Sequence, residues 1–437
     1  MVDVAEVRIW GELAGAVRWD TDNQLASFQY DNKFLTKGYD LSPIKMPIEN
    51  GNRIYSFPEL RRTKEEQTAT FNGLPGLLAD SLPDKYGNQL INVWLAQNGR
   101  PPDSMNPVEK LCFIGTRGMG ALEFEPTLLR SGKQSIPIEL KSLVETAQKI
   151  LSKRGAFEVN FHRDEQQALR EILKIGTSAG GVRPKAIITY NRKSGEVRSG
   201  QTNAPKGFEH WIIKLDGVSD AQFGTSHGFG RVEYAYYLMA KDCQIQMMDS
   251  ELFEENSRAH FMTRRFDREP DNTKHHIQTF SGIQHFDYNN LYGYSYEQLF
   301  QTMRMLKMTY PEAEQMFRRM VFNVMATNYD DHAKNFSFRL QQNGKWELSP
   351  AYDLCYSYDP DNIWVSQHSL SINGKHKGIN KEDLMEVAVA NNIKKGERVI
   401  EEIRDIVCNW EQYARTAHVS SPLTDSIKRT LASYYFR

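Results

Sequence analysis

The sequence of 437 residues has few cysteines, no long apolar run and almost no net charge. Its four cysteines are far apart and form no CxxC pair, so they indicate a reducing compartment rather than a disulfide framework. No run of about 20 apolar residues is present, and the charged N-terminus lacks the apolar core typical of a signal peptide. A net charge of −1 gives no basic surface for bulk nucleic-acid binding. We therefore expect a cytoplasmic protein with no membrane span.

The composition that remains is typical of a globular protein with more than one core. Hydrophobic residues make up 40% and charged residues 25% of the chain, whose length favours two or three domains. Residues 1–60 alternate like short antiparallel strands, whereas residues beyond about 295 have a helical pattern. This order predicts an α+β fold. The helices we expect include residues 85–97, 139–154, 164–174, 230–243, 296–306, 311–328, 381–390, 395–413 and 423–435.

The stretch 320–338 combines an apolar helix, a polar segment and a strand-like run. Asp330 and Asn335 enclose four residues, which is the spacing found in protein-kinase catalytic loops. There the acid accepts the proton of the attacking hydroxyl and the amide holds magnesium. Asp353 follows the strand-like pair 336–340 and 345–348, and a strand–turn–strand would return it to the loop. The alternative is that these acids only cap a loop and begin a turn.

Two further segments are suited to holding phosphate. The small residues of 176–185 precede a predicted strand, where main-chain N–H groups can approach an anion closely. Val182 and Arg183 stand where a Walker A loop needs Lys and Ser or Thr, so an ordinary turn is the alternative. Lys214 ends the apolar strand 211–215, and its charge needs an anion. Glu233 could pair with Lys214, or it could only stabilise a helix N-terminus.

Other polar segments give weaker signals. The glycines of 115–120 precede a strand and no helix, so they do not meet the requirements of a dinucleotide loop. His275, His276 and His285 have no common zinc spacing, and we expect them on a solvated surface. Residues 264–268 continue a strand into a cluster of charges, which an ordinary strand end would also explain.

The segment 328–338, Asn-Tyr-Asp-Asp-His-Ala-Lys-Asn-Phe-Ser-Phe, followed by 348–354, Leu-Ser-Pro-Ala-Tyr-Asp-Leu, resembles the catalytic core of the HipA family. These proteins are serine/threonine kinases that act as toxins of bacterial toxin–antitoxin pairs. Residues 76–83, Gly-Leu-Leu-Ala-Asp-Ser-Leu-Pro, resemble a phrase of the family's N-terminal region. The resemblance implies a two-lobed kinase-like fold with a β-rich N-terminal lobe and an all-α C-terminal lobe. It divides the chain into a β subdomain at 1–110, an N-lobe at 111–266 and a C-lobe at 267–437.

The resemblance also implies roles for individual residues. Asp330 would be the catalytic base, with Asn335 and Asp353 as metal ligands, and the choice of Asp330 over Asp331 depends on the family pattern alone. Phe266 would line the purine site, and Asp267 would face the ribose or phosphates. Ser178 would be the site of autophosphorylation, which inactivates the kinase. The implied nucleotide-binding residues are Ser178, Ala179, Gly180, Gly181, Lys185, Lys214, Arg264, Phe266, Asp267, His332, Lys334, Asn335 and Asp353.

The function that the resemblance implies is an ATP- and Mg²⁺-dependent protein kinase. Its implied partners are a HipB-like helix-turn-helix antitoxin, operator DNA mainly through that antitoxin, and a protein substrate such as an aminoacyl-tRNA synthetase. A small-molecule kinase is the alternative, because the same machinery phosphorylates sugars or antibiotics. A binding protein with a degenerate kinase fold is a third reading, but the intact Lys214, Asp330, Asn335 and Asp353 argue against it.

Overall fold

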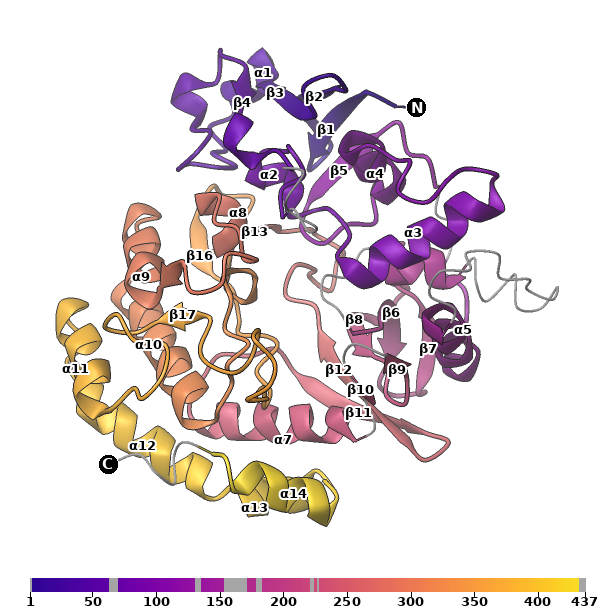
Figure 1. The fold of residues 1–437 in the computed structure, drawn as a ribbon. Coiled ribbons are helices and arrows are strands. Elements are labelled where there is room, and N and C mark those ends of the chain that lie inside the picture. The colour runs from indigo at the N-terminus through magenta and orange to yellow at the C-terminus, as the bar shows by residue number, and fades with distance from the viewer. Residues whose placement is uncertain are drawn as a thin grey trace. The chain divides into compact units, whose positions relative to one another are not determined.

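The computed structural model describes residues 2–62, 70–129, 135–152, 171–177, 183–220, 224–225 and 228–431. The chain, drawn in Figure 1, divides into two compact units. Unit 1 comprises Met1–Ser42, Met46–Gly230 and Glu251–Ile277. Unit 2 comprises Pro43–Lys45, Arg231–Ser250 and Gln278–Arg437.

Unit 1 begins with a five-stranded antiparallel sheet in the order β4-β3-β2-β1-β5. Its strands are β1 (Val4–Ile9), β2 (Glu12–Asp20), β3 (Leu25–Tyr30), β4 (Tyr55–Ser56) and β5 (Leu122–Glu125). Trp10 and Gly11 join β1 to β2 with φ of 52° and 81°, the left-handed pair that matches the twist of a two-residue hairpin. Strand β5 pairs with β1, so this sheet continues beyond the predicted boundary at residue 110.

Short helices accompany this sheet, and α4 leads into the glycine-rich segment 115–120. Helix α4 is started by Asn106, whose side chain accepts a hydrogen bond from Glu109 N at 2.7 Å, and by Pro107 in the first turn. It ends at Gly115, which has φ 60°. The helices of unit 1 are α1 (Asn32–Leu35), η1 (Ile48–Asn50), η2 (Pro58–Leu60), α2 (Gly76–Ala79), α3 (Lys85–Gln97), α4 (Pro107–Ile114) and α5 (Leu140–Ser152).

A second five-stranded sheet of unit 1 has the order β11-β12-β8-β6-β7. One face of β6 and β8 carries Ile188, Trp211 and Ile213, which pack in a buried cluster with residues of α3 and α5. Because side chains alternate along a strand, Lys185 and Lys214 lie on the other face. The strands are β6 (Lys185–Asn191), β7 (Glu196–Ser199), β8 (Glu209–Lys214), β11 (Ser250–Glu255) and β12 (Arg258–Arg264), and a separate pair consists of β9 (Ser219–Asp220) and β10 (Gly224–Thr225).

Unit 2 is mainly helical and is built around α10, in which every residue from Met316 to Met325 is buried. Helix α12 packs against α10. The helices are α7 (Phe229–Asp242), α8 (Phe280–Gln284), α9 (Tyr296–Met305), α10 (Tyr310–Met325), η3 (Ala333–Asn335), α11 (Lys381–Ala390), α12 (Gly396–Cys408), α13 (Trp410–Thr416) and α14 (Ser421–Lys428). Short strands form a sheet of β13 (His276–Thr279), β15 (Ser337–Leu340) and β16 (Trp346–Leu348), and a parallel pair of β14 (Tyr294–Ser295) and β17 (Leu370–Ser371).

The mixed α/β character predicted from the sequence is confirmed, with two corrections to the helical part. The prediction of an all-α C-terminal lobe is wrong, because strands β13 to β17 lie in it. Each spans only two to four residues, too short for a clear alternation signal. The helix expected at 395–413 is two helices, separated at Asn409. Helices α3 and α11 have the predicted bounds.

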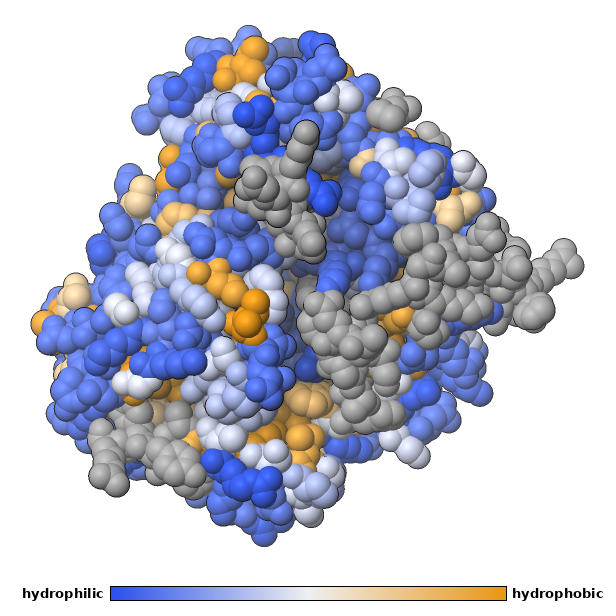
Figure 2. Space-filling model, viewed as in Figure 1, coloured by the Kyte–Doolittle hydropathy of each residue, from blue (hydrophilic) through white to orange (hydrophobic). Residues whose placement is uncertain are grey.

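No helix in the described part of the chain is long and apolar enough to cross a bilayer. The face drawn in Figure 2 is mostly hydrophilic, with hydrophobic residues in small separate groups.

Candidate functional site

The polar segment after α10 is held by the end of the helix and by a distant loop. Thr327 adopts φ 53°, which ends the helix three residues before the first acid of the segment. Asn328 Nδ2 donates to Asn323 Oδ1 at 2.9 Å, within the last turns of α10. The main-chain N–H of Tyr329 donates to Ser357 O at 3.1 Å. The main chain entering the segment is therefore supported from both sides.

Asp330 and Asn335 are brought together, as their spacing predicted. Asn335 Nδ2 donates to the main-chain oxygen of Asp330 at 2.5 Å, and η3 tightens the loop between them. This contact uses Nδ2 and not Oδ1, the atom that a metal ion would need. The Asp330 carboxylate is 46% exposed, with His332 Nε2 at 3.6 Å from its Oδ1. An outside hydroxyl could therefore reach Asp330.

Asp331, the neighbouring acid, is buried and fully engaged. Its Oδ2 accepts hydrogen bonds from Tyr296 OH at 2.9 Å and from His368 Nδ1 at 2.8 Å. Its Oδ1 accepts one from Ser369 N at 2.7 Å. The residue is 1% exposed. Asp331 therefore anchors the loop from inside, and Asp330 is the acid that a substrate can approach.

Asp353 returns towards this loop through the expected hairpin. Strands β15 and β16 pair antiparallel, with Phe338 opposite Leu348. Beyond β16, Tyr352 OH donates to the main-chain oxygen of Lys334 at 2.8 Å. Asp353 follows directly with φ 53°, a conformation that Asp tolerates better than most residues and that is enriched at functional sites. The predicted strand–turn–strand is confirmed, and the metal role of Asp353 stays a prediction.

His332 and Lys334, both expected to contact nucleotide, lie beside one aromatic ring. Lys334 Nζ is 4.8 Å from the centroid of the Tyr288 ring. The His332 ring is 5.3 Å from the same centroid. Tyr288 was not predicted, because a lone tyrosine in a polar loop carries no sequence signal.

In unit 1, Lys214 has a basic neighbour across the sheet. Lys185 on β6 and Lys214 on β8 are direct antiparallel partners, so their side chains share one face. Lys214 Nζ is 5.7 Å from the centroid of the Phe261 ring. Like charges directly opposite each other destabilise a sheet, and an anion between them would offset that repulsion. This arrangement suits a phosphate chain, and the pairing of Glu233 with Lys214 stays a prediction.

The structure does not support the predicted contact of Asp267 with ribose or phosphates. Asp267 is fully buried and accepts hydrogen bonds from Arg265 and Arg268, the shortest being 2.6 Å and 2.7 Å. Gly120 N also donates to Asp267 Oδ2 at 2.7 Å. Burial alone would raise the pKa of Asp267, but the two arginines hold it well below its usual range. The carboxylate has no surface left for a ligand, and we leave it out of the proposed nucleotide site.

This cluster also gives the glycine-rich segment 115–120 a structural role. The glycines of 115–120 wrap around it, because Gly118 O accepts from Arg268 Nη2 at 3.1 Å. Arg264, expected to contact nucleotide, has its Nη1 3.2 Å from Glu209 Oε1. Phe266 is partly buried. Its predicted purine contact stays a prediction.

Ser178, Ala179, Gly180 and Gly181 lie outside the described residues. Of the predicted loop, the structure describes 176–177 and 183–185.

The expectation that the three histidines lie on a solvated surface is wrong, because two are buried and His285 is only partly exposed. His276 is 1% and His275 is 8% exposed. His276 begins strand β13, and burial lowers its pKa to about 4. His275 Nε2 is paired with Glu269 Oε1 at 2.7 Å. Within the described residues, no three His, Cys, Asp or Glu side chains are grouped so as to hold a metal ion.

Comparison with protein families places this architecture in a known class. Residues 177–412 match the family described as the HipA-like C-terminal domain, and residues 5–125 match the HipA N-terminal domain. The first match alone covers more than half of the chain. The chain belongs to the HipA family. Comparison with curated proteins gives no match.

Solved structures agree at the level of the fold. HipA from Shewanella oneidensis MR-1, solved in complex with HipB and operator DNA, is 18% identical, with a TM-score of 0.69 over 99% of this chain and 97% of that one. The Helicobacter pylori proinflammatory kinase CtkA is 13% identical, with a TM-score of 0.33 over 51% of this chain and 88% of that one. The first comparison shows a shared fold, and the second is too distant to add to it.

Proposed function

We propose that this protein is an ATP- and Mg²⁺-dependent serine/threonine protein kinase and the toxin of a toxin–antitoxin pair. Membership of the HipA family supports this reading. The main support for the proposal is the geometry of the loop 330–335. There an exposed Asp330 carboxylate is linked to Asn335 and lies beside a buried, hydrogen-bonded Asp331. Protein kinases use this combination of accessible acid and oriented amide for phosphoryl transfer.

Different residues would serve as the catalytic base, the metal ligands and the phosphate-binding groups. Asp330 accepts the proton of the attacking hydroxyl. Asn335 Oδ1 and the Asp353 carboxylate are oxygen donors of the kind magnesium prefers, and two protein ligands suffice when phosphates complete the coordination. Lys214, with Lys185 opposite, holds the phosphate chain on the face of the sheet. Bound ATP would supply the phosphoryl group, and Mg²⁺ would neutralise the negative charge that develops on that group during transfer.

The partners follow from the family rather than from any surface of this structure. Under this proposal a helix-turn-helix antitoxin like HipB restrains the kinase, and operator DNA is contacted mainly through that antitoxin. The HipA of S. oneidensis was solved with both of these partners. The protein target would belong to translation, for example an aminoacyl-tRNA synthetase, and the kinase would also phosphorylate itself on Ser178. Under this proposal the protein acts in the cytoplasm.

Incubation of the purified full chain with radiolabelled ATP and Mg²⁺ tests the proposal. We expect phosphate on serine of the protein itself and on a protein target, located by peptide mass spectrometry. Asp330→Asn should abolish the label, whereas Asp361→Asn, the same change at an exposed acid of unit 2, should not. ATP turnover that labels a small molecule and no protein would favour a small-molecule kinase. No turnover with any acceptor would favour a degenerate binding protein.

A further inference from the structure

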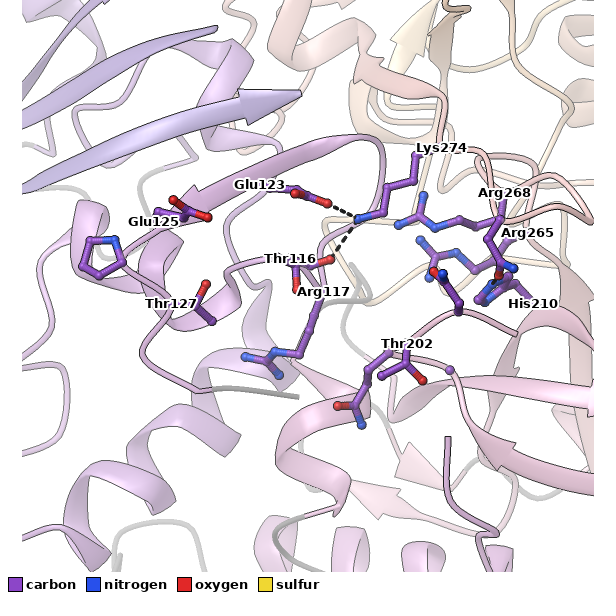
Figure 3. Close-up of a pocket in the computed structure, with 15 residues that line it drawn as sticks. Thr116, Arg117, Glu123, Glu125, Thr127, Thr202, His210, Arg265, Arg268 and Lys274 are labelled. Atoms are coloured by element: carbon purple, nitrogen blue, oxygen red, sulfur yellow. Dashed lines mark hydrogen bonds and ion pairs between the residues drawn. The ribbon is translucent and has the colours of Figure 1, made fainter. Parts of the chain in front are cut away.

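A polar pocket of about 790 Å³ lies within unit 1 (Figure 3). Segments far apart in sequence line it: the turn after α4, strand β5, the loop after β7, the start of β8 and the loop after β12. In Figure 3, Arg265, Arg268 and His210 gather on one side and Glu125 with Thr127 on the other. Lys185 and Lys214, the proposed phosphate clamp, are not among its lining residues. The volume is that of a pocket for a small organic ligand.

The charge around this pocket is unbalanced. Lys274 is paired with Glu123 at 2.6 Å, and Glu125 shares Arg8, at 3.2 Å, with Glu6, at 2.7 Å. Arg265 and Arg268 both pair with the carboxylate of Asp267, and Arg117 has no carboxylate partner among the described residues. With Glu6 counted beside Arg8, this group of side chains has an excess of one positive charge. Charges held out of water are costly unless they are paired. The pocket therefore favours an anion.

Arg117 contributes a buried donor that has no acceptor. The residue is 3% exposed, and its Nη1 and Nη2 donate to main-chain oxygens, including Lys174 O at 2.9 Å. Its Nε has no hydrogen-bond partner among the described residues. Burial lowers the pKa of Arg117 to about 10, so the guanidinium stays charged at neutral pH. Thr202 Oγ1, also buried and lining the pocket, is likewise unpaired within the described residues.

His210 contributes the opposite kind of group, a buried acceptor. Ala204 N donates to Asn272 Oδ1 at 2.6 Å, which identifies that atom as an acceptor. His210 Nε2, 2.8 Å from the same oxygen, must therefore carry its hydrogen. Burial and the nearby Arg265 lower the pKa of His210 to about 4, so the ring is neutral and Nδ1 bears a lone pair. Nδ1 is buried and has no donor among the described residues.

We propose that this pocket binds a small phosphorylated molecule that also carries a hydroxyl group, at a site separate from the nucleotide site around Lys214. The phosphate would accept hydrogen bonds from Arg117 Nε and Thr202 OH and satisfy the excess positive charge. The hydroxyl would donate to His210 Nδ1. A carboxylate without a hydroxyl leaves His210 unpaired, and a neutral molecule leaves the charge unbalanced. A sugar phosphate has both groups and a size that suits the volume.

Inorganic phosphate and sulfate together test the arrangement, because HPO₄²⁻ carries a hydroxyl and sulfate does not. We would titrate each into the full chain by calorimetry, using the Asp330→Asn form so that the protein does not phosphorylate itself. Saturating Mg²⁺ and a non-hydrolysable ATP analogue would keep the nucleotide site filled. We expect one phosphate to bind and sulfate to bind about tenfold or more weakly, since an unpaired buried acceptor has a cost of that order.

Variants separate this site from the proposed kinase site. Thr202→Val should weaken phosphate binding about five- to tenfold, whereas Thr21→Val, the same change at an exposed loop position, should not. His210→Gln should remove the preference for phosphate over sulfate. Lys214→Ala should leave phosphate binding unchanged, so the outcome does not depend on kinase activity. Equal affinities for the two ions, displacement of phosphate by the ATP analogue, or full affinity in Thr202→Val would each overturn the proposal.

Discussion

Replacing Asp331 and Asp330 separately by Asn should damage different properties of the protein. Asp331 receives three hydrogen bonds inside the core, whereas the Asp330 carboxylate is 46% exposed. The substitution is the same in shape and charge change at both positions. We expect Asp331→Asn to lower the free energy of unfolding and Asp330→Asn to remove phosphoryl transfer while leaving stability almost unchanged.

The magnitude at Asp331 follows from the geometry of its partners. In Asp331→Asn the amide oxygen can keep the bond from Ser369 N, and the new NH₂ group then faces Tyr296 OH and His368 Nδ1. An NH₂ group cannot accept a hydrogen bond, so the hydroxyl hydrogen of Tyr296 loses its acceptor. The Tyr296 oxygen already accepts from Asn323 Nδ2 at 2.9 Å. His368 can respond by changing its tautomer. One or two charge-assisted bonds are lost, which corresponds to about 2–4 kcal/mol of unfolding free energy.

Thermal and urea unfolding of the two variants, with transfer measured in parallel, tests this reasoning. Asp331→Asn should lower the Tm by about 5–10 °C. Asp330→Asn should stay within about 0.5 kcal/mol of the parent protein and lose on the order of 10²–10⁴ in rate. Asp361→Asn, also exposed, should change neither quantity. The assignment of the two acids fails if Asp331→Asn is as stable as the parent, or if Asp330→Asn retains full activity.

Further predictions concern the other groups. Asp353→Asn should abolish transfer without unfolding the protein, and wild-type activity in this variant would exclude a metal role for Asp353. Lys214→Ala should weaken binding of an ATP analogue with Mg²⁺ in calorimetry; unchanged affinity and turnover would mean that Lys214 has a structural partner instead. Phosphorylation of Ser178 adds about −1.5 to −2 charges and should oppose ATP binding, so tight binding by the fully phosphorylated form would refute the switch. Because the pKa of buried His276 is about 4, the unfolded chain binds more protons than the folded one between pH 6.5 and 4, and stability should fall by on the order of 2–3 kcal/mol as the pH drops through that window. His276→Gln should reduce that dependence in pH-resolved unfolding without abolishing it, because the buried His210 also has a pKa of about 4.

The elements with strong local signals were predictable from the sequence. Helix α11 is started by Asn380, whose side chain accepts from Asp383 N at 3.0 Å, and such a cap is visible in the sequence. The end of helix α10, from Met320 onward, is apolar on most faces and is buried accordingly. The break between α12 and α13 was missed because Asn409 is neither Gly nor Pro.

The catalytic loop was predictable in spacing but not in the direction of its side chains. Asp330 and Asn335 are near neighbours in sequence, so their contact follows from the local turn. The Asp267 cluster, in contrast, depends on Gly120, which is 147 positions away. A strand ending in Arg-Phe-Asp-Arg gives no sign that its carboxylate will be enclosed by a glycine-rich segment from another part of the chain.

The two adjacent acids show why such roles are decided by distant parts of the fold. Consecutive residues in a loop project their side chains in different directions, and which of the two becomes buried depends on what lies on each side. Asp331 meets its partners on α9 and in the segment 368–369, which are 35 to 38 positions away in sequence. None of these residues is special when read locally: a tyrosine, a histidine and a main-chain N–H. Asp331 anchors the loop only because these three groups lie on the same side of it. Asp330 is then directed outwards. The burial of Asp331 thus determines that Asp330 is the exposed acid. Substitutions at Tyr296 or His368 should therefore slow phosphoryl transfer, although neither residue contacts the reacting groups.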